Sequence, residues 1–181
     1  MTLSEKDGKL YYELWLPLLD FVNQKYRVNR KVKKMAGAQS LEPADVKAVS
    51  DKLCENPQVI DEYLSSCPNM LEEHRNIVEG WKRSIKGRFI IERHLKSGSI
   101  LISMEDETVY QVSGIITSIE EMFYYAPVPL MVEAILMPFR DVIITDGLIM
   151  PYNLMIGRNM KREFKEVYLT AKRNGELKKS L

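Results

Sequence analysis

Residues 127–150 read PVPLMVEAILMPFRDVIITDGLIM, the longest nearly uninterrupted apolar stretch of the 181-residue chain. The stretch is too long for one strand and is interrupted at Pro138 and again at Asp146-Gly147. It therefore predicts successive strands of a sheet that buries most of their side chains. Charged residues and prolines divide it well before the roughly 18 apolar residues that a membrane span requires, so we expect no span.

The segment 88–116 supplies the partners that these strands need. In RFIIERHL (88–95), apolar and polar residues alternate, which is typical of a strand with one buried face. Polar turns at 96–99 and 105–107 separate three such segments and predict an antiparallel meander. Together with the central stretch they form an antiparallel sheet of about five strands, which either stays open or curls into a small barrel.

Helical spacing dominates on both sides of the sheet. Apolar residues recur at intervals of three and four over 10–30, 42–85 and 158–173, which predicts N-terminal helices and one terminal helix that closes the sheet. Pro17 either kinks the first helix or separates two shorter ones. The predicted class is α+β, with a helical region at 1–85 and an antiparallel sheet region with a C-terminal helix at 86–181, forming either one compact unit or two.

Two local signals mark helix ends. Ser118 and Glu121 match the capping-box spacing, so a short helix interrupts the sheet there. Asn174-Gly175 is the expected C-terminal end of the last helix, because glycine tolerates the left-handed conformation that closes helices.

The composition is that of an ordinary globular protein, with 45% hydrophobic and 28% charged residues and a formal net charge of +1. No global charge attracts nucleic acid or an anionic membrane, so electrostatic arguments rest on local patches. Two cysteines are too few for a disulfide framework, and no signal-like segment opens the sequence. These features predict a cytoplasmic location.

Two segments are strongly basic. Residues 25–34 hold six basic residues and no acidic one, and residues 158–179 hold eight against three. Each segment either contacts phosphates or is the solvated part of a helix. If the first and last helices packed side by side, their charges would merge into one face that binds a nucleic-acid backbone or an acidic protein. The candidate binding residues are Arg27, Arg30, Lys31, Lys34, Arg158, Lys161 and Arg162.

Glu133, Asp141 and His94 are the candidates for acid–base chemistry in a small hydrolase-type enzyme. The competing interpretation is structural: Asp141 lies in the turn after Pro138-Phe139, and Glu133 faces solvent or pairs with an arginine. In the same way, Asp146-Gly147 predicts a hairpin rather than a catalytic carboxylate.

Metal and cofactor signatures are missing from the sequence. Cys54, Cys67 and His74 match no zinc spacing, and neither a Walker pattern nor a dinucleotide fingerprint occurs. We therefore expect no metal and no cofactor. The ten methionines either fill the core or form an adaptable partner surface.

The segments YQVSGIITSIEEM and LMVEAILMPFRDVIITDGLIM resemble an uncharacterised bacterial family in which a meander precedes a Pro-Phe turn and an Asp-Gly step. The resemblance covers about the C-terminal half and implies a fold unit, with no activity attached to it. Some similar proteins carry a cysteine-rich metal-binding tail, which this sequence lacks. The matching positions are Tyr110, Gly114, Ser118, Glu121, Pro138, Phe139, Asp146 and Gly147.

The sequence thus favours a non-enzymatic binding or regulatory protein that acts through protein or polyanion contacts, because no set of nucleophile, base and oxyanion donors can be assembled from it. A small hydrolase and a nonspecific nucleic-acid-binding protein are the alternatives. The expected partner is another protein or a second copy, with nucleic acid as the alternative and no membrane partner.

Overall fold

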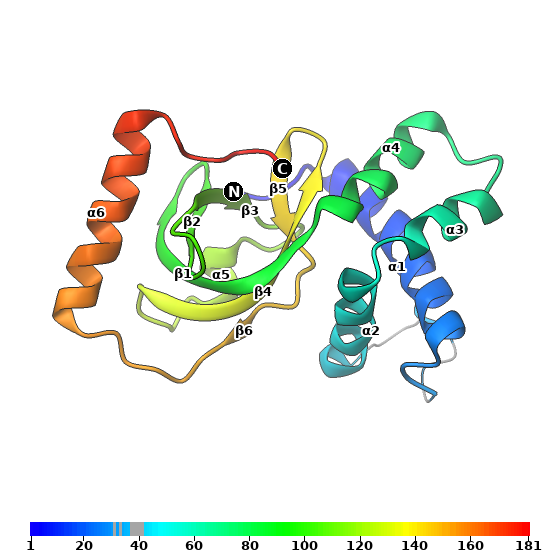
Figure 1. Ribbon diagram of the computed structural model, residues 1–181, viewed down its shortest axis with the longest axis horizontal. Coiled ribbons are helices and arrows are strands. Elements are labelled where there is room, and N and C mark those ends of the chain that lie inside the picture. Colours follow the sequence, from blue (N-terminus) through cyan, green and yellow to red (C-terminus); the bar gives the residue numbers. More distant parts are fainter. Residues whose placement is uncertain (31, 33, 37–41) are drawn as a thin grey trace.

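The computed structural model describes residues 1–30, 32, 34–36 and 42–181. It confirms the α+β class, with three parts arranged along the longest axis of the molecule (Figure 1). Four helices lie at one end, the sheet lies in the middle, and the last helix lies at the other end. The helices are α1 (Glu5–Tyr26), α2 (Pro43–Glu55), α3 (Val59–Ser66), α4 (Glu72–Gly80), the short α5 (Ile119–Met122) and α6 (Arg158–Asn174), with a 3-10 turn, η1 (Trp81–Arg83), after α4.

The sheet has six strands, and five of them close into a small barrel. The order around the barrel is β1-β2-β3-β5-β4, and β4 pairs in turn with β1, which closes the ring. β6 pairs with β4 on the edge that also carries β5. Neighbours run antiparallel except β3 and β5, which pair in parallel through Val112 and Ile143. A closed ring with an odd number of alternating strands must contain one parallel pair, so the sheet is mixed rather than wholly antiparallel. The strands are β1 (Ile85–Leu95), β2 (Gly98–Ser103), β3 (Val109–Ser113), β4 (Leu130–Phe139), β5 (Val142–Thr145) and β6 (Met150–Pro151).

The strands of the barrel are buried on both faces. Side chains such as Phe89, Val112 and Leu136 fill the interior of the barrel. The alternate positions of β1, β2 and β3 pack against α6, and those of β4 and β5, including Met137 and Ile144, pack against the helical part. This two-sided burial explains why the central stretch of the sequence is almost continuously apolar.

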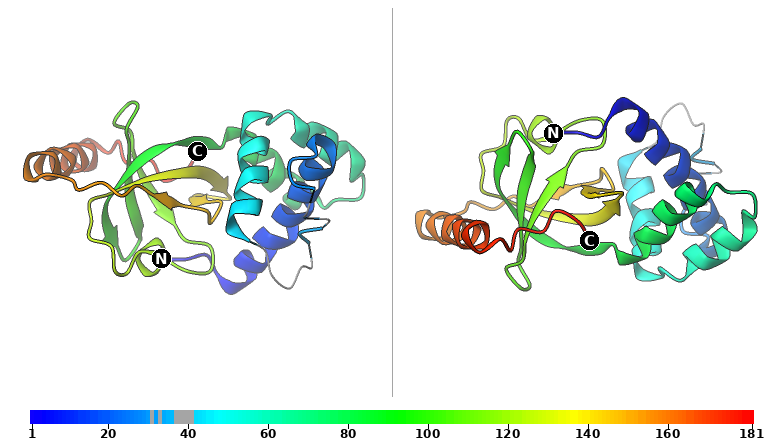
Figure 2. Two further views of the ribbon diagram at one scale, coloured as in Figure 1. Left: turned by 90° about the horizontal axis from the view of Figure 1, so that it is seen from below. Right: turned by 90° about the horizontal axis from the view of Figure 1, so that it is seen from above.

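The helical part shares its core with the barrel. Tyr11 and Trp15 on α1 contact the Trp81 ring, with ring centroids 5.9 and 5.1 Å away respectively. The same cluster contains Ile135 on β4. Helix α1 continues through Pro17, which excludes two separate shorter helices. Figure 2 shows α1 to α4 grouped against one end of the barrel, with α6 beyond the other end.

Both predicted caps are confirmed. The Ser118 hydroxyl accepts from the backbone N–H of Glu121, whose carboxylate accepts in return from the backbone N–H of Ser118. Gly175 ends α6 with a left-handed φ of 71°.

The predicted hairpin at Asp146-Gly147 is wrong. Thr145 pairs with Leu136 and Met150 pairs with Glu133, so β5 and β6 run in the same direction along one edge of β4. Residues 146–149 form an irregular connection between the two strands, and Gly147 takes a positive φ of 81° there. Glycine adopts positive φ in hairpin turns and in other connections alike, so the dipeptide did not distinguish them. The real hairpin is at Arg140 and Asp141, as predicted for Asp141.

Candidate anion-binding groove

Helix α6 carries three kinds of side chain on three sides. Buried Phe164, Tyr168 and Ala171 face the barrel, and Glu163 and Glu166 lie on a second, exposed side. The third side is basic, because cationic residues recur at intervals of three, four and seven. None of them forms an ion pair with any residue in the described part of the chain. This basic stripe consists of Arg158, Lys161, Arg162, Lys165 and Lys172.

The orientation of α6 is fixed by contacts with the outer face of the barrel. Phe164 and Tyr168 belong to the same buried cluster as Ile90 and Ile100. The Arg93 guanidinium lies 4.3 Å from the centroid of the Tyr168 ring, a cation–π contact. Because the apolar side of α6 is committed to the barrel, the basic stripe faces solvent.

The segment after α6 turns back along the barrel. Gly175 reverses the chain, and the N–H of Glu176 donates to the Ala171 carbonyl at 2.9 Å. Lys178 then lies beside β3: its N–H donates to the Val109 carbonyl at 2.9 Å, and its carbonyl accepts from the N–H of Gln111 at 2.8 Å. These two bonds hold the segment 176–181 at a fixed distance from α6.

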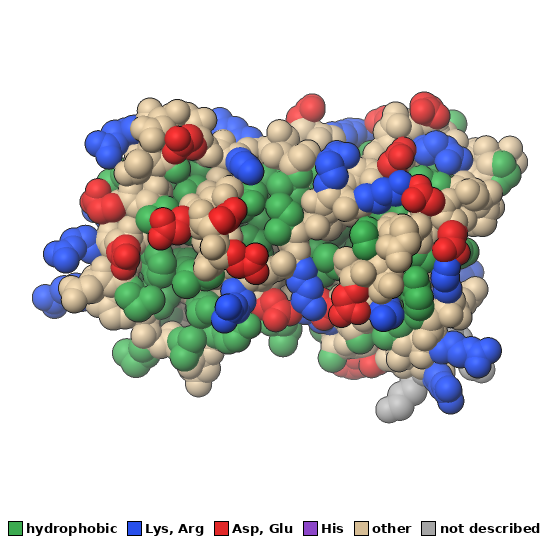
Figure 3. Space-filling view, viewed as in Figure 1, with side chains coloured by type: hydrophobic (Ala, Val, Ile, Leu, Met, Phe, Trp, Pro, Cys, Tyr) green, Lys and Arg blue, Asp and Glu red, His purple; other side chains and the backbone are tan. Residues whose placement is uncertain are grey.

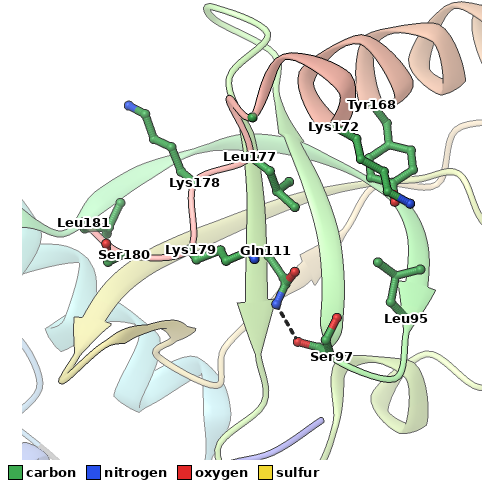
Figure 4. Close-up of a pocket in the computed structure, with 11 residues that line it drawn as sticks. Leu95, Ser97, Gln111, Tyr168, Lys172, Leu177, Lys178, Lys179, Ser180 and Leu181 are labelled. Atoms are coloured by element: carbon green, nitrogen blue, oxygen red, sulfur yellow. Dashed lines mark hydrogen bonds between the residues drawn. The ribbon is translucent and has the colours of Figure 1, made fainter.

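A groove of about 860 Å³ lies between the end of α6, this returning segment and the barrel. Figure 4 shows Lys172 reaching into it from α6 and Lys179 extending toward Gln111, while Lys178 points away. The Gln111 side-chain amide donates to the Ser97 carbonyl at 2.8 Å and is thereby oriented. The lining residues are Leu95, Ser97, Gln111, Tyr168, Lys172, Gly175, Leu177, Lys178, Lys179, Ser180 and Leu181.

The lining of the groove suits anion binding. The side chains of Lys172, Lys179 and Gln111 reach it, and no Asp or Glu side chain is among its described lining residues. Neither Lys172 nor Lys179 has an ion-pair partner in the part of the chain that the structure covers, whereas the Lys178 ammonium lies 5.9 Å from the Tyr110 ring centroid. The described lining contains two serine hydroxyls, those of Ser97 and Ser180, and no His, Asp or Glu side chain beside them that could act as a general base.

The predicted binding residues fall into two separate places. Arg158, Lys161 and Arg162 lie on the basic stripe, whereas Arg27, Arg30 and Lys34 follow α1 at the opposite end of the molecule (Figure 1). Lys31 lies outside the described residues. The first and last helices do not pack side by side, because the barrel lies between them, so their charges do not merge into one basic face.

The three candidate acid–base residues do not converge. Glu133 on β4 lies opposite Arg88 on β1 in the backbone register, and His94 lies six residues further along β1, about 20 Å away at the rise of a strand. Asp141 lies beyond the other end of β4, in the turn to β5. His94 Nδ1 is 2.8 Å from the Ser99 hydroxyl, and partial burial lowers the pKa of the imidazole.

Glu133 instead belongs to a structural ion-pair network with α2. Its carboxylate lies 3.2 Å from the ammonium of Lys47, so its partner is a lysine, which neither of the two alternatives predicted from the sequence named. Lys47 also pairs with Asp51 at 2.6 Å, and Asp51 with Lys86 at 3.1 Å. Burial by itself lowers the pKa of Lys47, but the hydrogen bonds to Asp51 and Glu133 outweigh it and raise that pKa.

The buried environment of Asp146 was not predicted from the sequence, which indicated a hairpin turn there. Its side chain is buried, and its carboxylate accepts from the Ser50 hydroxyl at 2.7 Å and from the N–H of Leu148 at 3.1 Å. Ser50 belongs to α2 and Leu148 to the segment that follows β5, so the carboxylate joins α2 to this segment.

Lys172, Lys178, Lys179, Tyr168 and Gln111 were not among the predicted site residues. The spacing of cations along residues 158–172 contained the signal for the stripe, because the period of a helix places them on one side. The groove had no such signal, since it depends on the direction in which the chain returns after Gly175.

Within the described residues, no group of three His, Cys, Asp or Glu side chains is placed to hold a metal ion. No described helix combines the length and the apolar character that crossing a bilayer demands. The resemblance to an uncharacterised bacterial family stays a prediction. Comparisons with protein-family models, with curated proteins and with solved structures found no match for this chain.

Proposed function

We propose that this is a non-enzymatic binding protein that holds a polyanionic partner on the basic stripe and in the adjoining groove. The observation that carries the proposal is the row of cations on one side of α6, which leads to Lys172 at the groove. These charges lack ion-pair partners among the described residues, so their interaction with a partner is not offset by lost internal pairs.

The chemistry of the surface favours charge recognition over sequence recognition. Flexible lysines and arginines in a row contact phosphates or carboxylates that follow one another along a chain. The one aromatic ring in the lining, that of Tyr168, is 2% exposed and engaged by Arg93, so it is not available for base stacking. The partner is thus defined by its density of negative charge.

The test measures binding of two labelled probes, a single-stranded oligonucleotide and a poly-glutamate peptide, by fluorescence polarisation. Affinity should fall steeply between about 50 and 200 mM salt, because several counterions are released from a polyanion on binding. The double variant Lys161→Glu with Arg162→Glu should weaken binding by more than about tenfold at low salt. Lys172→Glu with Lys179→Glu should also weaken binding, because both side chains reach into the groove.

The matched control is Arg27→Glu with Arg30→Glu, which changes the net charge equally at the opposite end of the molecule. It should keep affinity within about twofold of the wild type. Undetectable binding of both probes at low salt would reject the proposal. If the Arg27/Arg30 control lost as much affinity as the Lys161/Arg162 variant, binding would depend on net charge rather than on α6.

A further inference from the structure

Large apolar side chains protrude beside the start of the basic stripe. Leu154 is 59% exposed, Met155 is fully exposed and Met160 is 44% exposed. Leu154 and Met155 belong to the segment between β6 and α6, and Met160 lies in the first turn of α6. In Figure 3, hydrophobic side chains gather at the lower left of the molecule, over this segment.

The exposure of Leu154 and Met155 is built into the fold. On one side of them, the N–H of Tyr152 donates to the Met131 carbonyl of β4 at 2.9 Å. On the other side, Ile156 packs against the cluster under α6. The chain is therefore anchored at both ends, and Leu154 and Met155, two of the three residues between the anchors, are left exposed.

A second apolar group lies at the same end of the molecule. Tyr124 and Tyr125, just after α5, are 75% and 96% exposed, and their rings meet edge to face with centroids 5.0 Å apart. Figures 1 and 2 place the segment after α5 at the same end as the β6–α6 segment and the start of α6. Tyrosines with an apolar ring and a polar hydroxyl suit a boundary between water and an apolar phase.

The occupant of this surface must offer negative charge and apolar groups together over a broad area. The backbone of a nucleic acid offers the charge without the apolar groups, and would leave Leu154 and Met155 in water. The surface of an anionic bilayer offers both, because its headgroups attract Lys and Arg while side chains of Leu, Met and Tyr insert beneath them.

We infer that the start of α6 adsorbs to an anionic lipid bilayer, with Arg158, Lys161 and Arg162 on the headgroups and Leu154 and Met155 inserted. The inference rests on the proposed function, since it names the source of the polyanion. The sequence predicted no membrane partner because no segment is long enough to span a bilayer and the net charge is only +1, but adsorption through a local basic patch requires neither a span nor a large net charge. Glu163 lies on the side of α6 opposite the basic stripe, and Glu166, one turn after Arg162, lies at the edge of the stripe.

The experiment is co-sedimentation of the full chain with vesicles of phosphatidylcholine, with and without phosphatidylserine, at low salt. The wild type should sediment with the anionic vesicles and not with the neutral ones. Leu154→Ser with Met155→Ser leaves the charge unchanged and should lower the partition coefficient by about tenfold or more. Arg158→Glu with Arg162→Glu should lower it by a similar or larger factor, whereas Arg27→Glu with Arg30→Glu should leave it within about twofold.

Two readouts separate this inference from the proposed function. The double serine variant should bind the soluble oligonucleotide as the wild type does. In a Leu154→Trp variant, brominated lipids should quench the added indole, since the native Trp15 and Trp81 are buried in the helical part. Oligonucleotide binding without vesicle binding would overturn the membrane inference and leave the proposed function standing. Absence of both would overturn both, and an unquenched indole or unchanged partition of the serine variant would overturn insertion.

Discussion

The hydroxyl of Ser50 on α2 donates a 2.7 Å hydrogen bond to the carboxylate of Asp146, 96 residues later in the chain. Both side chains are buried, with exposures of 1% and 4%. The bond crosses from the helical part to the connection between β5 and β6. It therefore joins the helical part to the barrel, which were predicted from the sequence as two regions, 1–85 and 86–181.

Replacing Ser50 by alanine should destabilise the protein. The variant leaves a buried carboxylate without one of its donors, which costs about 1–3 kcal/mol in free energy of unfolding. Urea denaturation followed by circular dichroism measures the change. Ser65→Ala is the control, because Ser65 is exposed and bonds only to the Asp61 carbonyl within its own helix, so its effect should stay within about 0.5 kcal/mol. Equal effects would show that the Ser50 bond contributes nothing specific.

Asp146→Asn should change how stability depends on pH. Burial raises the pKa of the Asp146 carboxyl, although the Ser50 bond opposes that rise. The folded state then holds the proton more tightly than the unfolded state, so the contribution of Asp146 to stability is full below about pH 3.9 and is lost as pH rises through the folded pKa. The asparagine cannot titrate, and its stability relative to the wild type should increase across that window and then level off.

This pH dependence is measured by urea denaturation of both proteins at a series of pH values from acid to neutral. A stability difference that is the same at every pH would contradict the prediction, because it would mean that Asp146 titrates alike in the folded and unfolded states.

Gly114→Ala should be strongly destabilising. A Cβ at Gly114 would lie 2.1 Å from the carbonyl oxygen of Thr117, a backbone atom that cannot move aside alone. We expect a loss of more than about 2 kcal/mol in free energy of unfolding, measured by thermal and urea denaturation. Gly157→Ser is the comparison, because nothing lies within 4 Å of its Cβ position and serine is a good N-cap for α6. A tolerated Gly114→Ala would show that this loop can rearrange.

Phe164→Ala should loosen α6 while the barrel stays folded. Phe164 is 8% exposed in the cluster that attaches α6 to β1 and β2, and its truncation costs about 3–5 kcal/mol of local packing. Amide hydrogen exchange should accelerate along α6 and in the segment after it, but not in β4. Met160→Ala removes an exposed side chain of the same helix and should leave exchange unchanged. Uniform acceleration through the whole chain would indicate global destabilisation instead.

The sequence by itself determined the local elements. The helical period over 158–173, the alternation over 88–95 and the capping pair Ser118 and Glu121 each correspond to an element of the structure. These signals work because the period of a helix or strand and the geometry of a cap involve residues within a few positions of each other. For the same reason, the helical spacing of the cations on α6 could be recognised in the sequence.

Only the tertiary structure decided how the elements meet. It placed the two basic regions at opposite ends, turned Asp146 from an expected hairpin residue into a buried acceptor for Ser50, and closed the barrel through a parallel pair of β3 and β5. The groove beside Lys172 exists because Lys178 bonds to β3 after the chain reverses at Gly175. These relationships join residues far apart in the chain, and they depend on which faces pack together, which the local period of a sequence does not encode.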